Sequence, residues 1–188
     1  MENIAKKAVF LDRDGTLNED PGYLREPSQL KLIPGVGEAL ELLRRSGFSL
    51  IVISNQSGVG RGLIDPAAIP KIHAKMSELL SPWAVDVDDY YLCFHRPEDL
   101  CECRKPKPKL LLDAARVHHI DVSLSYMVGD KPADIGAGKQ AGCKAVALVR
   151  TGEGKATEAH LQKGEADFIG DSLLDVARWI LKRENANS

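Results

Sequence analysis

The sequence contains no long apolar run. No segment is both long and apolar enough to cross a bilayer as a helix. Residues 1–7 are polar and lead directly into an apolar stretch, so the apolar region and small-residue cleavage site of a secretory signal are missing as well. These absences exclude a helical membrane protein and favour a cytoplasmic location.

An excess of charge of one sign is also missing. The chain has 25 Lys and Arg against 27 Asp and Glu, and only 5% of its residues are aromatic. A basic stripe interleaved with aromatic residues, as nucleic-acid-binding proteins use, is therefore not evident. We expect a monomer that binds neither nucleic acid nor an anionic membrane, so that any anionic ligand is held by a local site.

Cysteine is scarce and unevenly placed. Of the 4 cysteines, all but Cys143 crowd with a histidine into one short segment, as Cys93, His95, Cys101 and Cys103. In a reducing compartment such a cluster favours a metal site over disulfides. The ligands can close tetrahedrally on zinc, although their spacing is tighter than in zinc fingers; buried thiols beside a surface histidine are the alternative. A site coordinated entirely by protein leaves no open position for water, so we expect structural zinc that fixes a loop at about residues 93–103.

Short apolar runs alternate with amphipathic segments of helical length. The runs at residues 8–11, 49–54, 90–94, 126–129 and 145–149 are predicted strands, and the segments at 36–45, 66–80, 108–118, 134–141 and 173–182 are predicted helices. This alternation indicates a parallel sheet covered on both faces, so we predict one α/β domain over residues 1–188 with a Rossmann-like three-layer α/β/α architecture. The absence of a long insertion leaves no room for a separate cap domain and implies an open crevice.

Polar residues follow the predicted strands, where ligands bind in parallel sheets. Asp12 and Asp14 leave the first strand together, although a solvated turn explains this pair alone about as well. Other strand ends and the loop before residue 108 add Ser54, Asn55, Gln56, Ser57, Arg104, Lys105, Asp130 and Asp134. Carboxylates from several strand ends would repel one another without a cation, and magnesium prefers such oxygen ligands together with a substrate phosphate. The combination favours a magnesium-dependent phosphate site.

These residues resemble the four ordered motifs of the haloacid dehalogenase superfamily. The motifs are Asp12-Arg13-Asp14-Gly15-Thr16, Ser54, Lys105, and Gly129-Asp130 with Asp134. The resemblance implies that Asp12 is the nucleophile, forming an aspartyl-phosphate, and that Asp14 protonates the leaving alcohol and later activates water. Ser54 and Lys105 would steady the phosphoryl group, and magnesium would bind Asp12, the Asp14 backbone carbonyl and Asp130. As an acid, Asp14 needs a raised proton affinity, which neighbouring carboxylates can provide.

The cysteine cluster narrows the resemblance within this superfamily. The cluster resembles that of the D-glycero-D-manno-heptose 1,7-bisphosphate 7-phosphatases, and so do the segments Asp20-Pro21-Gly22-Tyr23 and Asn55-Gln56-Ser57-Gly58. These enzymes serve nucleotide-activated heptose and lipopolysaccharide precursor synthesis. This similarity implies removal of the 7-phosphate. The residues it places against the substrate are Asp20, Pro21, Gly22, Tyr23, Asn55, Gln56, Ser57, Arg104 and Lys131.

Other functions stay open at this stage. The related histidinol-phosphate phosphatases share most of these motifs, and some polynucleotide end phosphatases share the first. A non-catalytic module that uses an inherited phosphate pocket is a further alternative, although the retention of both Asp12 and Asp14 argues against it.

Overall fold

The computed structural model describes residues 6–186, which contain a six-stranded sheet with parallel pairing throughout. The strand order is β3-β2-β1-β4-β5-β6. The strands are β1 (Lys7–Leu11), β2 (Phe48–Asn55), β3 (Asp89–Cys93), β4 (Tyr126–Gly129), β5 (Ala145–Val149) and β6 (Phe168–Gly170).

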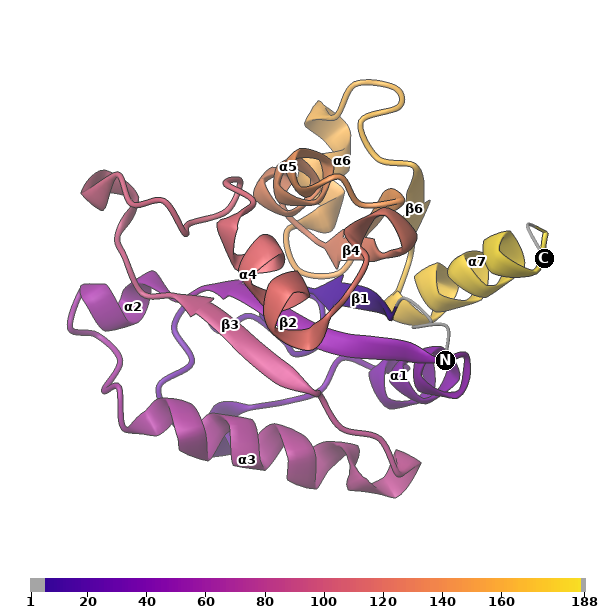
Figure 1. Cartoon of the computed structure of the whole chain (residues 1–188). Helices are drawn as coiled ribbons and strands as arrows, with labels where there is room; N and C mark the ends of the chain where they lie inside the picture. Colours follow the sequence, from indigo (N-terminus) through magenta and orange to yellow (C-terminus); the bar gives the residue numbers. More distant parts are fainter. Residues whose placement is uncertain (1–5, 187–188) are drawn as a thin grey trace.

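Helices cover both faces of the sheet (Figure 1). One hydrophobic cluster joins one face to α1 (Val36–Arg45), α3 (Ala68–Leu80) and α7 (Leu173–Asn185), and a second joins the other face to α4 (Lys109–His118) and α5 (Pro132–Ala141). The shorter helices are α2 (Ser57–Gly60) and α6 (Gly154–His160), with 3-10 turns at Pro27–Gln29, Ser81–Trp83, Pro97–Asp99 and Val122–Leu124. The predicted three-layer α/β/α architecture is confirmed.

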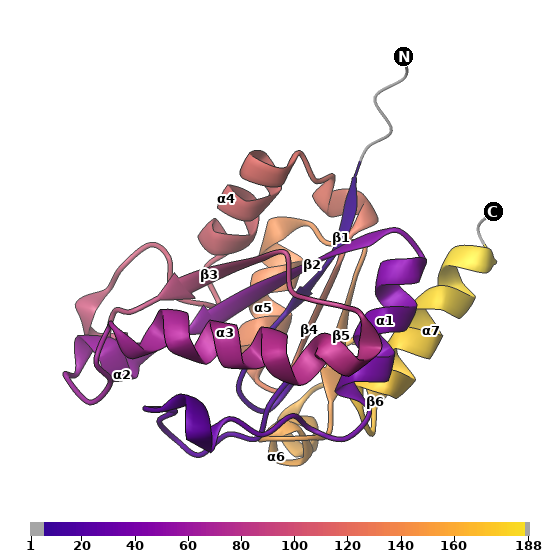
Figure 2. The same cartoon turned by 90° about the horizontal axis from the view of Figure 1, so that it is seen from below.

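The sheet is apolar through its centre because both of its faces are covered. Residues 8–11 of β1 and residues 145–149 of β5 are buried without interruption. The order of the strands along the chain reverses between β1 and β4, and the crevice beyond the carboxyl ends at such a reversal is where open α/β sheets bind ligands. Figure 2 shows α6 and the segment that follows β1 at this end of the sheet.

Two elements near the C-terminus were absent from the sequence prediction. β6 has only three residues, and the helix α6 buries only Gly154 and Thr157, so neither carries a clear apolar period. The helix predicted at 134–141 begins earlier, at Pro132, which occupies the first turn that proline favours. Residues 12–35 and 94–108 contain only loops and short 3-10 turns, so no separate cap domain lies between β1 and α1 or between β3 and α4.

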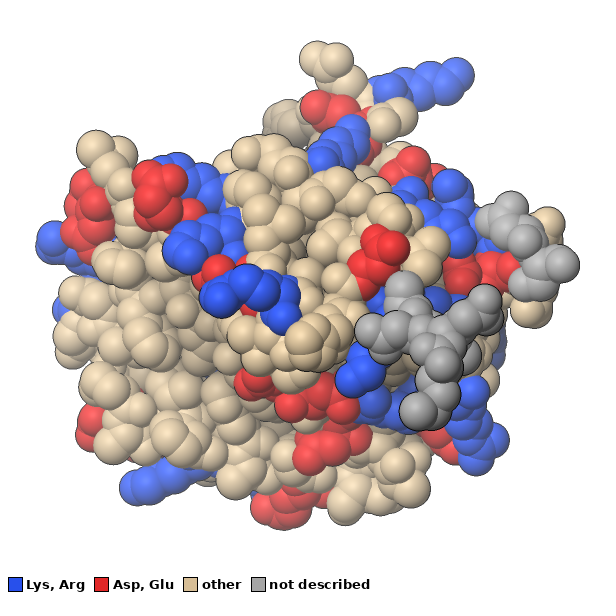
Figure 3. Space-filling view, viewed as in Figure 1, with Lys and Arg blue, Asp and Glu red and all other residues tan. Residues whose placement is uncertain are grey.

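Charges of both signs lie scattered over the face drawn in Figure 3, and neither sign forms a continuous patch there. Within residues 6–186, no helix has the length and apolarity required to cross a membrane.

Candidate active site

Three carboxylates meet at the reversal point of the sheet. Asp12 follows β1, Asp130 follows β4, and Asp134 lies in the first turn of α5; one oxygen from each lies within 4.8 Å of the others. All three side chains are buried. Burial, followed by the negative charge of Asp12, raises the pKa of Asp130 to about 7 and that of Asp134 to about 6.

This carboxylate group fits a divalent cation. Asp130 Oδ1 is buried and has no hydrogen-bond partner among the described residues, which is costly for a carboxylate oxygen unless a cation or a donor faces it. Magnesium takes oxygen ligands about 2.1 Å away, so ligand oxygens around one ion lie roughly 3–4 Å apart. The carboxylates of Asp12, Asp130 and Asp134 are therefore placed to hold an ion of this kind.

Lys105 joins two of these carboxylates. Its Nζ lies 2.9 Å from Asp12 Oδ1 and 2.7 Å from Asp134 Oδ1, and it also donates to the carbonyl oxygen of Ile53 at 2.5 Å. Burial opposes the charge, but Asp12 and Asp134 hold the pKa of Lys105 above its ordinary value. The ammonium is thus a fixed positive charge beside Asp12.

Asp14 lies in a second network with the fully buried Arg13. Arg13 Nε and Nη2 donate to the two Asp14 oxygens at 3.0 and 2.8 Å, and Asn18 and Gln56 donate to them at 2.9 and 2.8 Å. The Gln56 amide also accepts from Arg13 and donates to Ser54 Oγ, so it ties Ser54 to Asp14.

The expectation of a raised proton affinity for Asp14 is wrong for this geometry. Burial alone would raise the pKa of Asp14, but the charge of Arg13 and the hydrogen bonds from Arg13, Asn18 and Gln56 together lower it below its ordinary value. The nearby carboxylates alone would favour protonation, but the buried guanidinium of Arg13 bonds both Asp14 oxygens and favours the ionised form. Strand alternation continued beyond β1 would place Arg13 and Asp14 on opposite sides, so it gave no signal for this contact. The bend after β1 brings the two side chains together.

A crevice of about 330 Å³ opens above these groups. The predicted residues that line it are Asp12, Asp14, Asp20, Gly22, Tyr23, Ser54, Asn55, Gln56, Ser57, Arg104, Lys105, Lys131 and Asp134. Pro21 is exposed and does not line it, and Asp130 lies beneath it with no exposed surface. Lys131 Nζ lies 3.3 Å from Asp20 and 3.4 Å from Glu153, so a cation flanked by two carboxylates stands at the rim.

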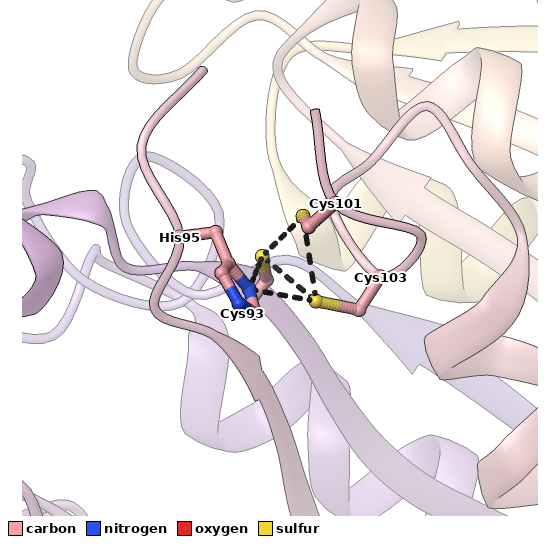
Figure 4. A group of neighbouring side chains, drawn as sticks. All are labelled: Cys93, His95, Cys101 and Cys103. Carbon is pink, nitrogen blue, oxygen red and sulfur yellow. Dashed lines mark hydrogen bonds between the residues drawn. The ribbon is translucent and has the colours of Figure 1, made fainter. Parts of the chain in front are cut away.

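The cysteine cluster forms beside the crevice. Cys93, His95, Cys101 and Cys103 point toward one another from the end of β3 and the following loop (Figure 4). Cys93 Sγ lies 3.6 Å from Cys101 Sγ, 3.1 Å from Cys103 Sγ and 3.7 Å from His95 Nδ1, and Cys103 Sγ lies 3.3 Å from the same nitrogen. Ligands about 2.3 Å from a tetrahedral zinc lie roughly 3.8 Å apart, close to this spacing. The cluster can hold a metal ion.

Known proteins resemble the chain over almost its whole length. A HAD-hydrolase-like family model matches residues 102–176. The D-glycero-beta-D-manno-heptose-1,7-bisphosphate 7-phosphatase of Escherichia coli K12 is 40% identical over 94% of this chain and 95% of its own, and that of Haemophilus influenzae is 43% identical over 94% and 97%. This chain belongs to the heptose bisphosphate phosphatase family.

A solved structure agrees with this assignment. The D,D-heptose 1,7-bisphosphate phosphatase of B. bronchiseptica, complexed with magnesium and phosphate, superposes with a TM-score of 0.86 at 36% identity. The match covers 95% of this chain and 99% of that one. The predicted superfamily and its closer heptose phosphatase group are both confirmed.

Residues 151–157 of this family member hold Asp130 in place, a role the sequence did not reveal. The backbone N–H of Glu153 donates to Asp130 Oδ2 at 2.8 Å, and Thr157 Oγ1 donates to the Asp130 carbonyl at 2.8 Å. Thr151 Oγ1 bonds the Gly15 carbonyl at 2.6 Å, which fixes the segment against the loop after β1. These partners fix the orientation of Asp130 as supporting groups do around metal ligands.

Proposed function

We propose that the chain is a magnesium-dependent phosphomonoesterase that removes the 7-phosphate of D-glycero-beta-D-manno-heptose 1,7-bisphosphate, within nucleotide-activated heptose synthesis. The observation that carries the proposal is the meeting of Asp12, Asp130 and Asp134 with Lys105 at the base of a polar crevice. Relatives that bear this activity's name at 40% identity and above support the choice of substrate.

Asp12 is the group placed to attack phosphorus. As a bond forms between an Asp12 oxygen and phosphorus, the bond from phosphorus to the sugar oxygen breaks, and the phosphoryl group is carried as an aspartyl-phosphate. Lys105, 2.9 Å from Asp12, counters negative charge on the transferring oxygens. Magnesium, held by Asp12, Asp130 and the Asp14 carbonyl with Asp134 beside them, supplies further positive charge against the phosphate.

Asp14 manages the protons in this proposal. The leaving sugar oxygen takes a proton from Asp14, and Asp14 takes one back from the water that hydrolyses the aspartyl-phosphate. Its oxygens here accept four hydrogen bonds, which fill the acceptor positions of a carboxylate. The lowered pKa keeps Asp14 ionised, as a base must be. In both steps one of these hydrogen bonds must open, so that an Asp14 oxygen can carry the proton.

The rim of the crevice supplies selectivity. Arg104 and Lys131 line the crevice and make no hydrogen bond to Asp12, and we assign them to the anionic and polar groups beyond the reacting phosphate. Asp20, Tyr23 and Ser57 offer acceptors and donors for sugar hydroxyls.

We assign zinc to the cysteine cluster, in a structural role. The cluster ends at Cys103, next to Arg104, whose Nη1 lies 3.4 Å from the His95 carbonyl. Because all its ligands come from the chain, the cluster would fix the loop that carries Arg104 and Lys105.

Substrate profiling tests the proposal. We expect kcat/KM for the beta anomer of heptose 1,7-bisphosphate to exceed that for the alpha anomer, fructose 1,6-bisphosphate, histidinol phosphate and a phosphorylated oligonucleotide. Turnover should require magnesium and vanish in Asp12→Asn. A preference for histidinol phosphate or for the oligonucleotide would replace the heptose assignment, and a magnesium-independent activity would reject the mechanism.

A further inference from the structure

Asn55 bonds the main chain of the phosphate-binding lysine. Its Nδ2 donates to the Lys105 carbonyl at 3.1 Å, and its Oδ1 accepts from the Lys105 N–H at 3.0 Å. The carboxamide therefore pairs with both backbone polar groups of one residue, 50 positions along the chain. Turning the amide over would place donor against donor and acceptor against acceptor, so these contacts fix its orientation.

Lys105 depends on such contacts because its backbone lies in neither a helix nor a strand. Residues 101–108 are turns and bends between β3 and α4, so regular backbone pairing does not place the lysine. Asn55, in contrast, is the last residue of β2 and pairs in register with Cys93 of β3. Asn55 thus connects the carboxyl end of β2, a strand inside the sheet, directly to the irregular loop that carries Lys105.

The position of the Lys105 side chain must be accurate. Its buried Nζ contacts Asp12, Asp134 and the Ile53 carbonyl at once, so a small shift of its backbone breaks at least one of these contacts. Since a displacement of about 1 Å at a reacting group costs on the order of 100-fold in rate, whatever fixes this backbone controls turnover.

We infer that Asn55 is a positioning residue, which acts on the reaction by holding Lys105 rather than by contacting the substrate. The inference rests on the proposed phosphatase function and deepens it. Asn55 and its neighbour Ser54 both line the crevice. The Asn55 amide oxygen and nitrogen are both engaged by the Lys105 backbone, so we replace the predicted substrate contact of Asn55 with this positioning role.

A double-mutant cycle on kcat/KM tests the inference. Asn55→Ala should lower kcat/KM for the heptose bisphosphate by on the order of tenfold or more, as loss of a supporting partner does around active-site groups. In a Lys105→Ala background the same change should cost less than about twofold, because the residue through which it acts is gone. Equal losses in both backgrounds would show that Asn55 contacts the substrate itself and would overturn the inference.

Gln140→Ala is the matched control. Gln140 Nε2 donates to the Pro106 carbonyl at 3.0 Å, so it holds the same loop one residue beyond Lys105. We expect this variant to lose less than about threefold in kcat/KM. A loss as large as that of Asn55→Ala would mean general loop anchoring and would reject a specific role for Asn55.

Asn55→Ser provides a second test if the alanine variant folds poorly. Circular dichroism and zinc content establish that each variant is folded, and the serine variant should show the same dependence on the Lys105 background. An inactive wild-type enzyme would instead reject the proposed function, so the two failures are distinguishable.

Discussion

Replacing Gly152 with alanine should damage the proposed magnesium site without changing any of its proposed ligands. Gly152 has a φ of +55°, and a Cβ atom added to it would lie 2.2 Å from Asp130 Oδ2 and 2.6 Å from Gly15 Cα. Non-bonded heavy atoms settle at about 3.5 Å, so the Asp130 carboxylate must retreat by more than about 1 Å.

The size of the effect follows from this overlap. A displacement of about 1 Å costs on the order of 100-fold in rate, and loss of a supporting contact costs roughly 10–100-fold in metal affinity. We therefore expect Gly152→Ala to lower kcat/KM about 100-fold and to raise the magnesium concentration for half-maximal activity at least tenfold. The left-handed backbone adds about 1–2 kcal/mol of destabilisation for a residue with a Cβ.

Gly164→Ala separates the two costs. Gly164 has a φ of +86° but nothing within 4 Å of its added Cβ, so this variant is destabilised only by the left-handed backbone conformation. Magnesium titrations of activity and denaturant unfolding of both variants give the comparison. If Gly152→Ala matches Gly164→Ala in kcat/KM and magnesium dependence, the argument that residues 151–157 hold Asp130 is wrong.

Two further predictions concern the metal cluster and pH stability. Wild-type protein should bind about one equivalent of zinc per chain, and Cys101→Ser should lose this zinc together with at least about 3 kcal/mol of stability. Cys143→Ser, outside the cluster, should keep both. Metal analysis and unfolding test this, and zinc retained by Cys101→Ser would contradict the four-ligand site. Burial opposes the charge of Glu184, but hydrogen bonds from Lys144, Lys7 and Tyr126 lower its pKa to about 2. A lowered folded-state pKa gives stability that is present above about pH 4.5 and is lost as the pH falls toward 2. Over that window the free energy of unfolding of the wild type should fall by about 1–2 kcal/mol more than that of Glu184→Gln, after allowance for solvent screening. Parallel curves of unfolding free energy against pH for the two proteins would refute the assignment.

The fold was largely predictable because its central strands are strongly apolar. Both faces of a parallel sheet are covered, so β1, β2, β4 and β5 are recognisable by composition alone. β6 and α6 were not predicted from the sequence because they are short and are fixed by tertiary contacts, such as that between Thr157 and Asp130. Organisation as a single domain over residues 1–188 stays a prediction.

The candidate site was predictable where residues follow strand ends, and less so elsewhere. Asp12 and Asp130 follow neighbouring parallel strands, so topology alone brings them together. Glu153, Thr157 and the role of Arg13 depend on how loops and a buried guanidinium pack, which no local pattern encodes. The catalytic and substrate-binding roles assigned from the motifs stay predictions.

Trapping the covalent intermediate tests the central claim most directly. Wild-type enzyme quenched in acid during turnover of heptose 1,7-bisphosphate should carry one phosphoryl group, located by mass spectrometry on Asp12 and released by hydroxylamine. Asp12→Asn should carry none and release no phosphate. Phosphate release by Asp12→Asn at a rate near that of the wild type, or a phosphoryl group on another residue, would contradict attack by Asp12.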